Sequence, residues 1–298
     1  MKRFYYWFYL MMVLFVGVYI LPNSLAQDSN SQKGLLWQIT PPGSKPSYLL
    51  GTIHSEDPRV LKLPAKIKHH FEQADRFICE MSMDLATTLQ ISGAMLFTDG
   101  QTLEKLLDKP LYKQIVKVLT QRDIPLNMIK IMKPWAVIAT LNAPPSETGI
   151  FLDLMLYKDA KRLQKPVYGL ETAEEQLQIF ASFSLEEQII LIKETLKQFN
   201  SMPKLFDKLH ELYLARDLSA IMVFSKNYMR SDNEQHELLL NIFLKRLLDE
   251  RNLRMIERMQ SYLQKGNAFI AVGALHLPGD QGLLRLLEKQ GYQVKVIY

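Results

Sequence analysis

Short apolar runs separated by turn residues mark both ends of the chain, and a long stretch of helical period lies between them. In the first zone the runs of strand length are 35–39, 48–50 and 77–79. In the last zone they are 268–272 and 292–297. Each zone also contains one helical period, at about 64–74 and at about 282–290. Runs of this length bounded by Pro and Gly predict β-strands.

The middle zone has apolar residues at helical spacing. The stretch Thr102–Gln121 carries leucine, isoleucine and valine at this period and predicts one helix, and similar periods run through 185–199 and 234–263. One run of strand length, 166–170, interrupts this zone and ends at Glu171. The middle zone is therefore predicted to be helical, with one added strand.

Together these zones predict an α/β fold with a mixed central sheet. Both ends show the order strand, Gly-x-x-His, Pro-containing loop, helix, strand, which suggests two units that share one sheet. The helical insertion between them covers about 101–265, and residues 27–298 form one domain. A chance match of two strand–helix–strand units is the alternative interpretation.

The first residues predict export. Lys2 and Arg3 precede an uncharged stretch at 4–21, and Ser24-Leu25-Ala26 offers the small residues that a signal peptidase requires. Residues 1–26 are thus predicted to be a signal peptide, and an uncleaved membrane anchor is the alternative. Under either interpretation the body of the protein lies in the periplasm or the cell envelope, with membrane contact only through this segment.

Composition narrows the function classes. Cys79 is the only cysteine, so no internal disulfide forms, and its apolar surroundings predict a buried thiol. The formal net charge of +5 is spread along helical stretches among Asp and Glu. No run of Lys or Arg alternates with aromatic residues, which argues against nucleic acid as a partner. The oligomeric state is not encoded in any pattern that we can identify.

Candidate chemistry gathers at the ends of predicted strands. The motifs Gly51-Thr52-Ile53-His54 and Gly273-Ala274-Leu275-His276 each follow an apolar run, and Glu80 and Glu171 end two others. Side chains at the carboxyl ends of strands converge at one edge of an α/β sheet. Two imidazoles and two carboxylates suit a divalent cation, with zinc, iron, nickel and manganese all compatible. Alternatively, the histidines cap loops and Glu171 caps the following helix.

Several ordered motifs make the chain resemble the TraB/GumN family, which includes the Tiki proteases. These motifs are Leu49-Leu50-Gly51-Thr52-Ile53-His54, Lys133-Pro134-Trp135, Lys165-Pro166-Val167-Tyr168-Gly169-Leu170-Glu171-Thr172, Glu250-Arg251-Asn252 and Val272-Gly273-Ala274-Leu275-His276-Leu277-Pro278-Gly279. The resemblance implies a metal-dependent hydrolase, with manganese or cobalt favoured. The family's metal-site residues fall on His54, Glu80 and His276, with Glu171 in the Gly-Leu-Glu-Thr motif as the fourth.

We therefore expect an exported metal-dependent hydrolase that acts as a peptidase through a metal-activated water. His54, Glu80 and His276 would bind the ion, and Glu80 or Glu171 would transfer the proton. The substrate would be a peptide or protein. A non-catalytic envelope protein that binds a peptide, haem or another ligand is the alternative.

Three further polar residues have two interpretations each. Arg251, Asn252 and Asp153 either orient a substrate or an inner loop, or occupy exposed helix positions.

Overall fold

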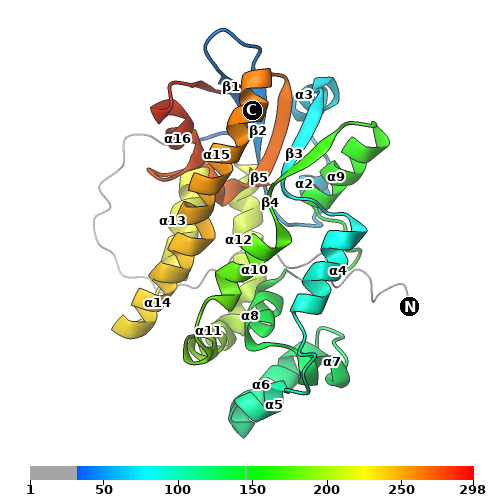
Figure 1. The fold of residues 1–298 in the computed structure, drawn as a ribbon. Coiled ribbons are helices and arrows are strands. Elements are labelled where there is room, and N and C mark those ends of the chain that lie inside the picture. The colour runs from blue at the N-terminus through cyan, green and yellow to red at the C-terminus, as the bar shows by residue number, and fades with distance from the viewer. Residues whose placement is uncertain (1–31, 145) are drawn as a thin grey trace.

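A mixed six-stranded sheet forms the centre of the fold in the computed structural model, which describes residues 32–144 and 146–298 (Figure 1). The strands are β1 Leu36–Thr40, β2 Ser47–Thr52, β3 Arg76–Met81, β4 Val167–Glu171, β5 Ala268–Gly273 and β6 Gln293–Val296, in the order β4-β3-β5-β2-β1-β6. All neighbouring pairs from β4 to β2 are parallel, and β1 runs antiparallel to both β2 and β6. The predicted α/β class with a mixed sheet is confirmed. The predicted signal peptide or anchor, 1–26, lies outside the described residues.

The two Gly-x-x-His motifs leave adjacent strands of this sheet. Strands β2 and β5 pair in parallel, with Gly51 opposite Val272 and Thr52 opposite Gly273. Leu49, Leu50 and most of β5 are fully buried, as expected for parallel strands that are covered on both faces. Residues more than 200 positions apart in the chain therefore end at the same edge of the sheet.

Helices surround the sheet and extend beyond its carboxyl edge. Their bounds are α2 Pro58–Leu61, α3 Ala65–Gln73, α4 Leu85–Ala94, α5 Leu103–Leu106, α6 Lys109–Thr120, α7 Leu126–Ile131, α8 Pro134–Asn142, α9 Leu152–Arg162, α10 Ala173–Ala181, α11 Leu185–Gln198, α12 Met202–Leu214, α13 Leu218–Tyr228, α14 Glu234–Leu244, α15 Glu250–Lys265 and α16 Leu283–Lys289. Three short segments complete them: η2 Phe199–Ser201 and η4 Ala274–His276 are 3₁₀ helices, and η3 Lys245–Asp249 is a π-helix. Helices α3 and α9 cover one face of the sheet and α15 and α16 the other (Figure 1). None of the helices in the described ranges is long and apolar enough to cross a bilayer.

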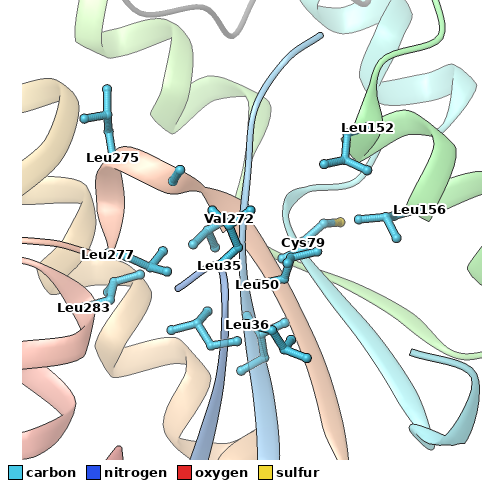
Figure 2. Close-up of a cluster of buried hydrophobic side chains, with 14 of the residues drawn as sticks. Leu35, Leu36, Leu50, Cys79, Leu152, Leu156, Val272, Leu275, Leu277 and Leu283 are labelled. Carbon is cyan, nitrogen blue, oxygen red and sulfur yellow. The ribbon is translucent and has the colours of Figure 1, made fainter. Parts of the chain in front are cut away.

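Buried apolar side chains form two clusters. The sheet cluster joins Leu50, Cys79 and Val272 to Leu156 of α9 and Leu283 of α16 (Figure 2). The helical cluster is built from α4 to α8, α10, α11 and α14. Phe199 and Leu244 pack against both clusters, so the two cores are in direct contact.

One predicted helix is divided in the structure. The stretch 102–121 forms α5 and α6, because Asp108 breaks the first helix and caps the second by accepting a hydrogen bond from Leu111 N at 2.8 Å. Pro110 occupies the first turn of α6, where its missing N–H has no cost. The stretch 234–263 is continuous helix, but the π-helical segment η3 separates α14 from α15.

Candidate functional site

The four side chains predicted at strand ends come from the carboxyl ends of four strands. His54 follows β2 and His276 follows β5, whereas Glu80 and Glu171 lie near the ends of β3 and β4. His54, Glu80 and His276 line one pocket together with Arg251 of α15. Glu171 does not line that pocket, but it forms an ion pair with Arg251, which does. The sheet therefore brings three of the four predicted residues to one cavity.

His276 is held in a single orientation by Asn252. The imidazole Nδ1 lies 2.7 Å from Asn252 Oδ1, and the amide nitrogen of Asn252 donates to Gln281 O at 2.7 Å. Because the amide oxygen can only accept, the proton of neutral His276 resides on Nδ1 and Nε2 is left with a free lone pair. Nε2 lies 3.7 Å from Glu80 Oε1. Burial, reinforced by the Arg251 charge, lowers the pKa of His276 to about 4.

His54 has a matching arrangement with Asp153 of α9. Its Nδ1 lies 3.3 Å from Asp153 Oδ2, and Thr52 donates to the other carboxylate oxygen at 2.6 Å. Among the described residues, Asp153 Oδ2 has no hydrogen-bond partner, although it lies close to the His54 imidazole. Phe151 stacks edge-on against the imidazole with ring centroids 4.7 Å apart. Burial raises the pKa of Asp153, although His54 and the Thr52 hydrogen bond oppose this effect.

Glu80 is a buried carboxylate with strong donors on both oxygens. Gly273 N donates to Oε1 at 2.6 Å and Arg251 Nη2 to Oε2 at 2.5 Å. Burial alone would raise the pKa of Glu80, but the charge of Arg251, followed by His276 and the Gly273 N–H, lowers the pKa to about 2. Glu80 is therefore ionised at neutral pH.

Glu171 accepts hydrogen bonds on both carboxylate oxygens but does not itself line the pocket. It accepts hydrogen bonds from Arg251 Nε at 2.9 Å, Arg254 Nη1 at 2.8 Å and Gln176 Nε2 at 3.2 Å. The alternative role as a helix cap is wrong, because Thr172 is the N-cap of α10 and forms a capping box with Glu175. Glu171 thus fixes Arg251, which in turn bridges to Glu80.

The alternative of exposed helix positions is wrong for Arg251, Asn252 and Asp153. Their exposed fractions are 4%, 2% and 5%. Helical period offered a signal for two of them, since Arg251 and Asn252 precede the buried Met255 and Ile256 by four residues each and share their face of α15. Asp153 lies in the first turn of the amphipathic α9, where an acidic residue is also favoured by the helix dipole, so its sequence position did not indicate burial.

The two motif glycines allow close packing and do not use positive φ. Neither Gly51 nor Gly273 belongs to the glycines with positive φ, so neither serves a left-handed turn. A Cβ on Gly51 would lie 3.1 Å from Ala274 Cα, and one on Gly273 would lie 3.3 Å from Glu80 Oε1 and 3.5 Å from His276 Cδ2. The glycines therefore let the two motifs and Glu80 approach each other.

The donor set fits a divalent cation chemically. The Nδ1 of His276 is hydrogen-bonded to Asn252, and the Nδ1 of His54 lies 3.3 Å from the Asp153 carboxylate. A side-chain oxygen at this position is the usual outer support of a metal-bound histidine. Glu80 supplies an ionised oxygen next to His276. The described residues nevertheless contain no assembled group of three His, Cys, Asp or Glu side chains at metal-binding geometry. Binding would thus require the side chains of His54, His276 and Glu80 to close on the ion.

Comparison of the sequence with known proteins identifies a family and several similar proteins. The sequence profile of the TraB/PrgY/gumN family matches residues 35–296. The chain is similar to the metalloprotease TIKI2 of Danio rerio, at 26% identity over 90% of the chain, and to metalloprotease TIKI1 of Homo sapiens, at 25% over 91%. It is also similar to the uncharacterized protein YbaP of Escherichia coli, at 23% identity over 84% of the chain and 90% of YbaP. The chain spans about three fifths of the length of the TIKI relatives, 61% for TIKI2 and 63% for human TIKI1.

Proposed function

Because the chain belongs to the TraB/PrgY/gumN family, we propose that it is a metal-dependent peptidase centred on His54, His276 and Glu80. Several relatives carry the name metalloprotease, which supports this reaction class. The chain covers only part of their length, so activity, substrate and partners are proposed here for this chain. A peptide or protein is the proposed substrate.

One observation carries the proposal. Two histidines leave adjacent parallel strands, and in each the Nδ1 atom faces a buried side-chain oxygen, Asp153 for His54 and Asn252 for His276. Histidines that only capped loops would bond to backbone carbonyls, and no such bond is made by either ring within the described residues. Two imidazoles in one pocket, each with Nδ1 next to a buried side-chain oxygen, are the arrangement expected of a metal centre.

The remaining residues have distinct proposed roles. Glu80 binds the ion or stabilises it electrostatically, because a carboxylate with a pKa of about 2 is a weak proton acceptor at neutral pH. Arg251 keeps Glu80 ionised, and Glu171 holds Arg251 in place. This assignment differs from the expected role of Glu171 as a base. When bound, a divalent ion would lower the pKa of a water from 15.7 toward ~7 and so supply the nucleophile.

The donors and the family resemblance support a small set of divalent ions. Two imidazoles and one carboxylate accept zinc, manganese or cobalt, and the resemblance favours the last two. We further propose that residues 1–26 direct export to the periplasm or envelope. Mass analysis of the protein purified from cells would test this, since removal of 1–26 is expected and a mass that includes these residues would indicate the anchor alternative.

Metal stoichiometry tests the proposed centre. We expect the purified wild type to bind about one manganese or zinc ion, and the double variant His54→Ala/His276→Ala to bind none. His69→Ala/His70→Ala is the matched control, because these two histidines lie on α3 outside the pocket. Equal stoichiometry in all three proteins would refute a shared site.

Peptide digestion tests the reaction class. We expect cleavage of a peptide library by the metal-loaded protein, loss of cleavage with a chelator, and recovery after manganese or cobalt is restored. Glu80→Gln should reduce kcat/KM by a factor of about 100 or more, because it replaces an ionised ligand by a neutral amide. Metal binding without any cleavage would favour the alternative of an envelope binding protein.

A further inference from the structure

Beside the polar cluster, the pocket continues between apolar side chains. The polar end holds His54, Glu80, Arg251 and His276. The remaining wall is mostly apolar and includes Ile91 of α4, Leu177 and Phe180 of α10, Phe206 of α12, Ile221 of α13 and Leu247 of η3. The catalytic groups proposed above therefore stand at one end of an apolar chamber.

This chamber lies where the two hydrophobic clusters meet. Phe206 and Ile221 belong to the sheet cluster, whereas Ile91, Phe180 and Leu247 belong to the helical cluster. Protein interiors are normally packed without gaps, and a void at such a seam costs stability unless a ligand fills it. An apolar pocket at this seam, next to the polar cluster, therefore suits a substrate side chain that would fill it.

The charged side chains along the chamber are already paired, and the Tyr213 proton is in use. The hydroxyl of Tyr213 donates to Gly51 O at 2.9 Å. Arg251 is paired with Glu80 and Glu171, and Gln176 donates to Glu171. A charged side chain in this chamber would lose its hydration without gaining a counter-ion.

The volume restricts the size of the occupant. The whole pocket, with its polar end included, measures about 110 Å³, so the apolar chamber is smaller than this. An engineered apolar cavity of ~150 Å³ binds benzene, which has six carbon atoms. A four-carbon branched chain is thus of suitable size, whereas an indole ring is too large.

We propose that this chamber binds a branched aliphatic side chain of leucine size, next to the peptide bond that is cleaved. The inference deepens the proposed peptidase function and rests on it. It assigns a substrate class, namely peptides with Leu or a similar residue beside the cleaved bond.

A series of peptides that differ at one position tests the assignment. With the metal-loaded wild type, we expect kcat/KM for the Leu peptide to exceed that for the Ala peptide by about tenfold or more, since each buried methylene group adds discrimination. Asp and Trp at the same position should be cleaved more slowly than Leu. Equal rates across the series would overturn the chamber assignment and leave the peptidase proposal intact.

A pair of variants on α13 tests whether the chamber causes the preference for Leu over Ala. Ile221→Phe fills part of the chamber and should shift the preference from Leu toward Ala. Val223→Phe is the matched control, because Val223 is 44% exposed on the same helix and does not line the pocket. It should retain the wild-type preference. Thermal melts verify folding, and if Ile221→Phe does not fold, the wild-type peptide series decides the question alone.

Binding measurements separate failure of the chamber from failure of the reaction. Saturation-transfer NMR would compare N-acetyl-leucine methylamide with N-acetyl-aspartate methylamide on the full-length protein. If no peptide is cleaved, the proposed function fails, while preferential leucine binding that is weakened by Ile221→Phe still supports the chamber. Absence of that preference overturns the chamber assignment.

Discussion

Each histidine of the candidate centre depends on one buried neighbour for its orientation. Asn252 reaches His276 from α15, and Asp153 reaches His54 from α9. The two neighbours differ chemically, because Asn252 is fully hydrogen-bonded whereas Asp153 Oδ2 makes no hydrogen bond in the described part of the chain. His276 is therefore the more rigidly held of the two.

Replacement of Asn252 should weaken metal binding without removing a proposed ligand. We expect Asn252→Leu to reduce affinity for manganese or zinc by about 10- to 100-fold, since loss of an outer partner frees the imidazole tautomer. Metal titration measures the affinity, and ¹⁵N chemical shifts of His276 report whether the proton leaves Nδ1. Asn142→Leu is the control, because Asn142 is a buried helical asparagine outside the pocket lining. Similar affinity in both variants would contradict a positioning role.

The neutral state of His276 should make the metal-free protein sensitive to acid. The pKa of His276 is about 4 in the folded chain and 6.5 without burial, so the unfolded chain takes up the proton first. Its contribution to stability is complete above pH ~6.5 and decreases as the pH falls toward 4, by at most about 3 kcal/mol. Urea unfolding with chelator present, at pH 7.5 and 5, should show a smaller decrease in His276→Gln than in wild type. Parallel decreases would mean that His276 is not buried in its neutral form.

Strand-end position predicted His54, Glu80, Glu171 and His276 as one group, because parallel strands bring their carboxyl ends to a common edge. All of these except Glu171 line one pocket. Asp153 and Asn252 could not be assigned in the same way. The Thr52–Asp153 hydrogen bond joins residues 101 positions apart. The helical period predicts which face of a helix is buried, but it does not predict which strand that face packs against. Glu171 shows the opposite problem, since a local capping pattern explained its position until the long-range contact with Arg251 was known.

At the scale of elements, the two Gly-x-x-His motifs differ in what their glycines contact. The missing Cβ of Gly51 faces the backbone of η4, at 3.1 Å from Ala274 Cα, whereas that of Gly273 faces the flexible carboxylate of Glu80. The backbone of Ala274 cannot move away by rotation about side-chain bonds, whereas the Glu80 carboxylate can. The same substitution should therefore have different consequences at β2 and β5.

We expect Gly51→Ala to act on stability and Gly273→Ala to act on the site. Gly51→Ala should lower the free energy of unfolding by about 1–3 kcal/mol through overpacking. Gly273→Ala should cost less stability but reduce metal affinity, since Glu80 and His276 must shift by a few tenths of an ångström. Urea unfolding and metal titration of both variants measure the two effects. A larger stability loss for Gly273→Ala than for Gly51→Ala would contradict this assignment.

The type of an element was predictable where the apolar period and the turn residues agreed. Its boundaries were not predictable where a helix cap divided a continuous period. The strand at 268–272 and the helix at 185–199 match β5 and α11 closely. The division of 102–121 depends on the Asp108 cap, whose effect competes with an uninterrupted leucine period. The π-helical segment η3 keeps helical period on both sides, so nothing in the pattern indicates it.

At the scale of the whole molecule, the site sits between two cores and connects them. Arg251 of α15 joins Glu80 in β3 to Glu171 in β4, while the pocket wall takes side chains from both hydrophobic clusters. Phe199 and Leu244 pack on both clusters. Neither core can therefore separate from the other without exposing to water the apolar side chains that pack at the seam.

Residues 32–298 should accordingly unfold as one cooperative unit, as expected for the predicted single domain. Trp37 packs against the sheet cluster and Trp135 is buried in the helical cluster, so each reports on one core. The variants Trp37→Phe and Trp135→Phe, each made in a Trp7→Phe background, leave one tryptophan apiece. For each variant, circular dichroism measures the loss of helix in urea. We expect the fluorescence transition of each variant to coincide with its own loss of helix. If the Trp135 signal instead changed at lower urea than the helical signal of the same variant, the helical cluster would open first, and the pocket at the seam would be a hinge between two independent parts.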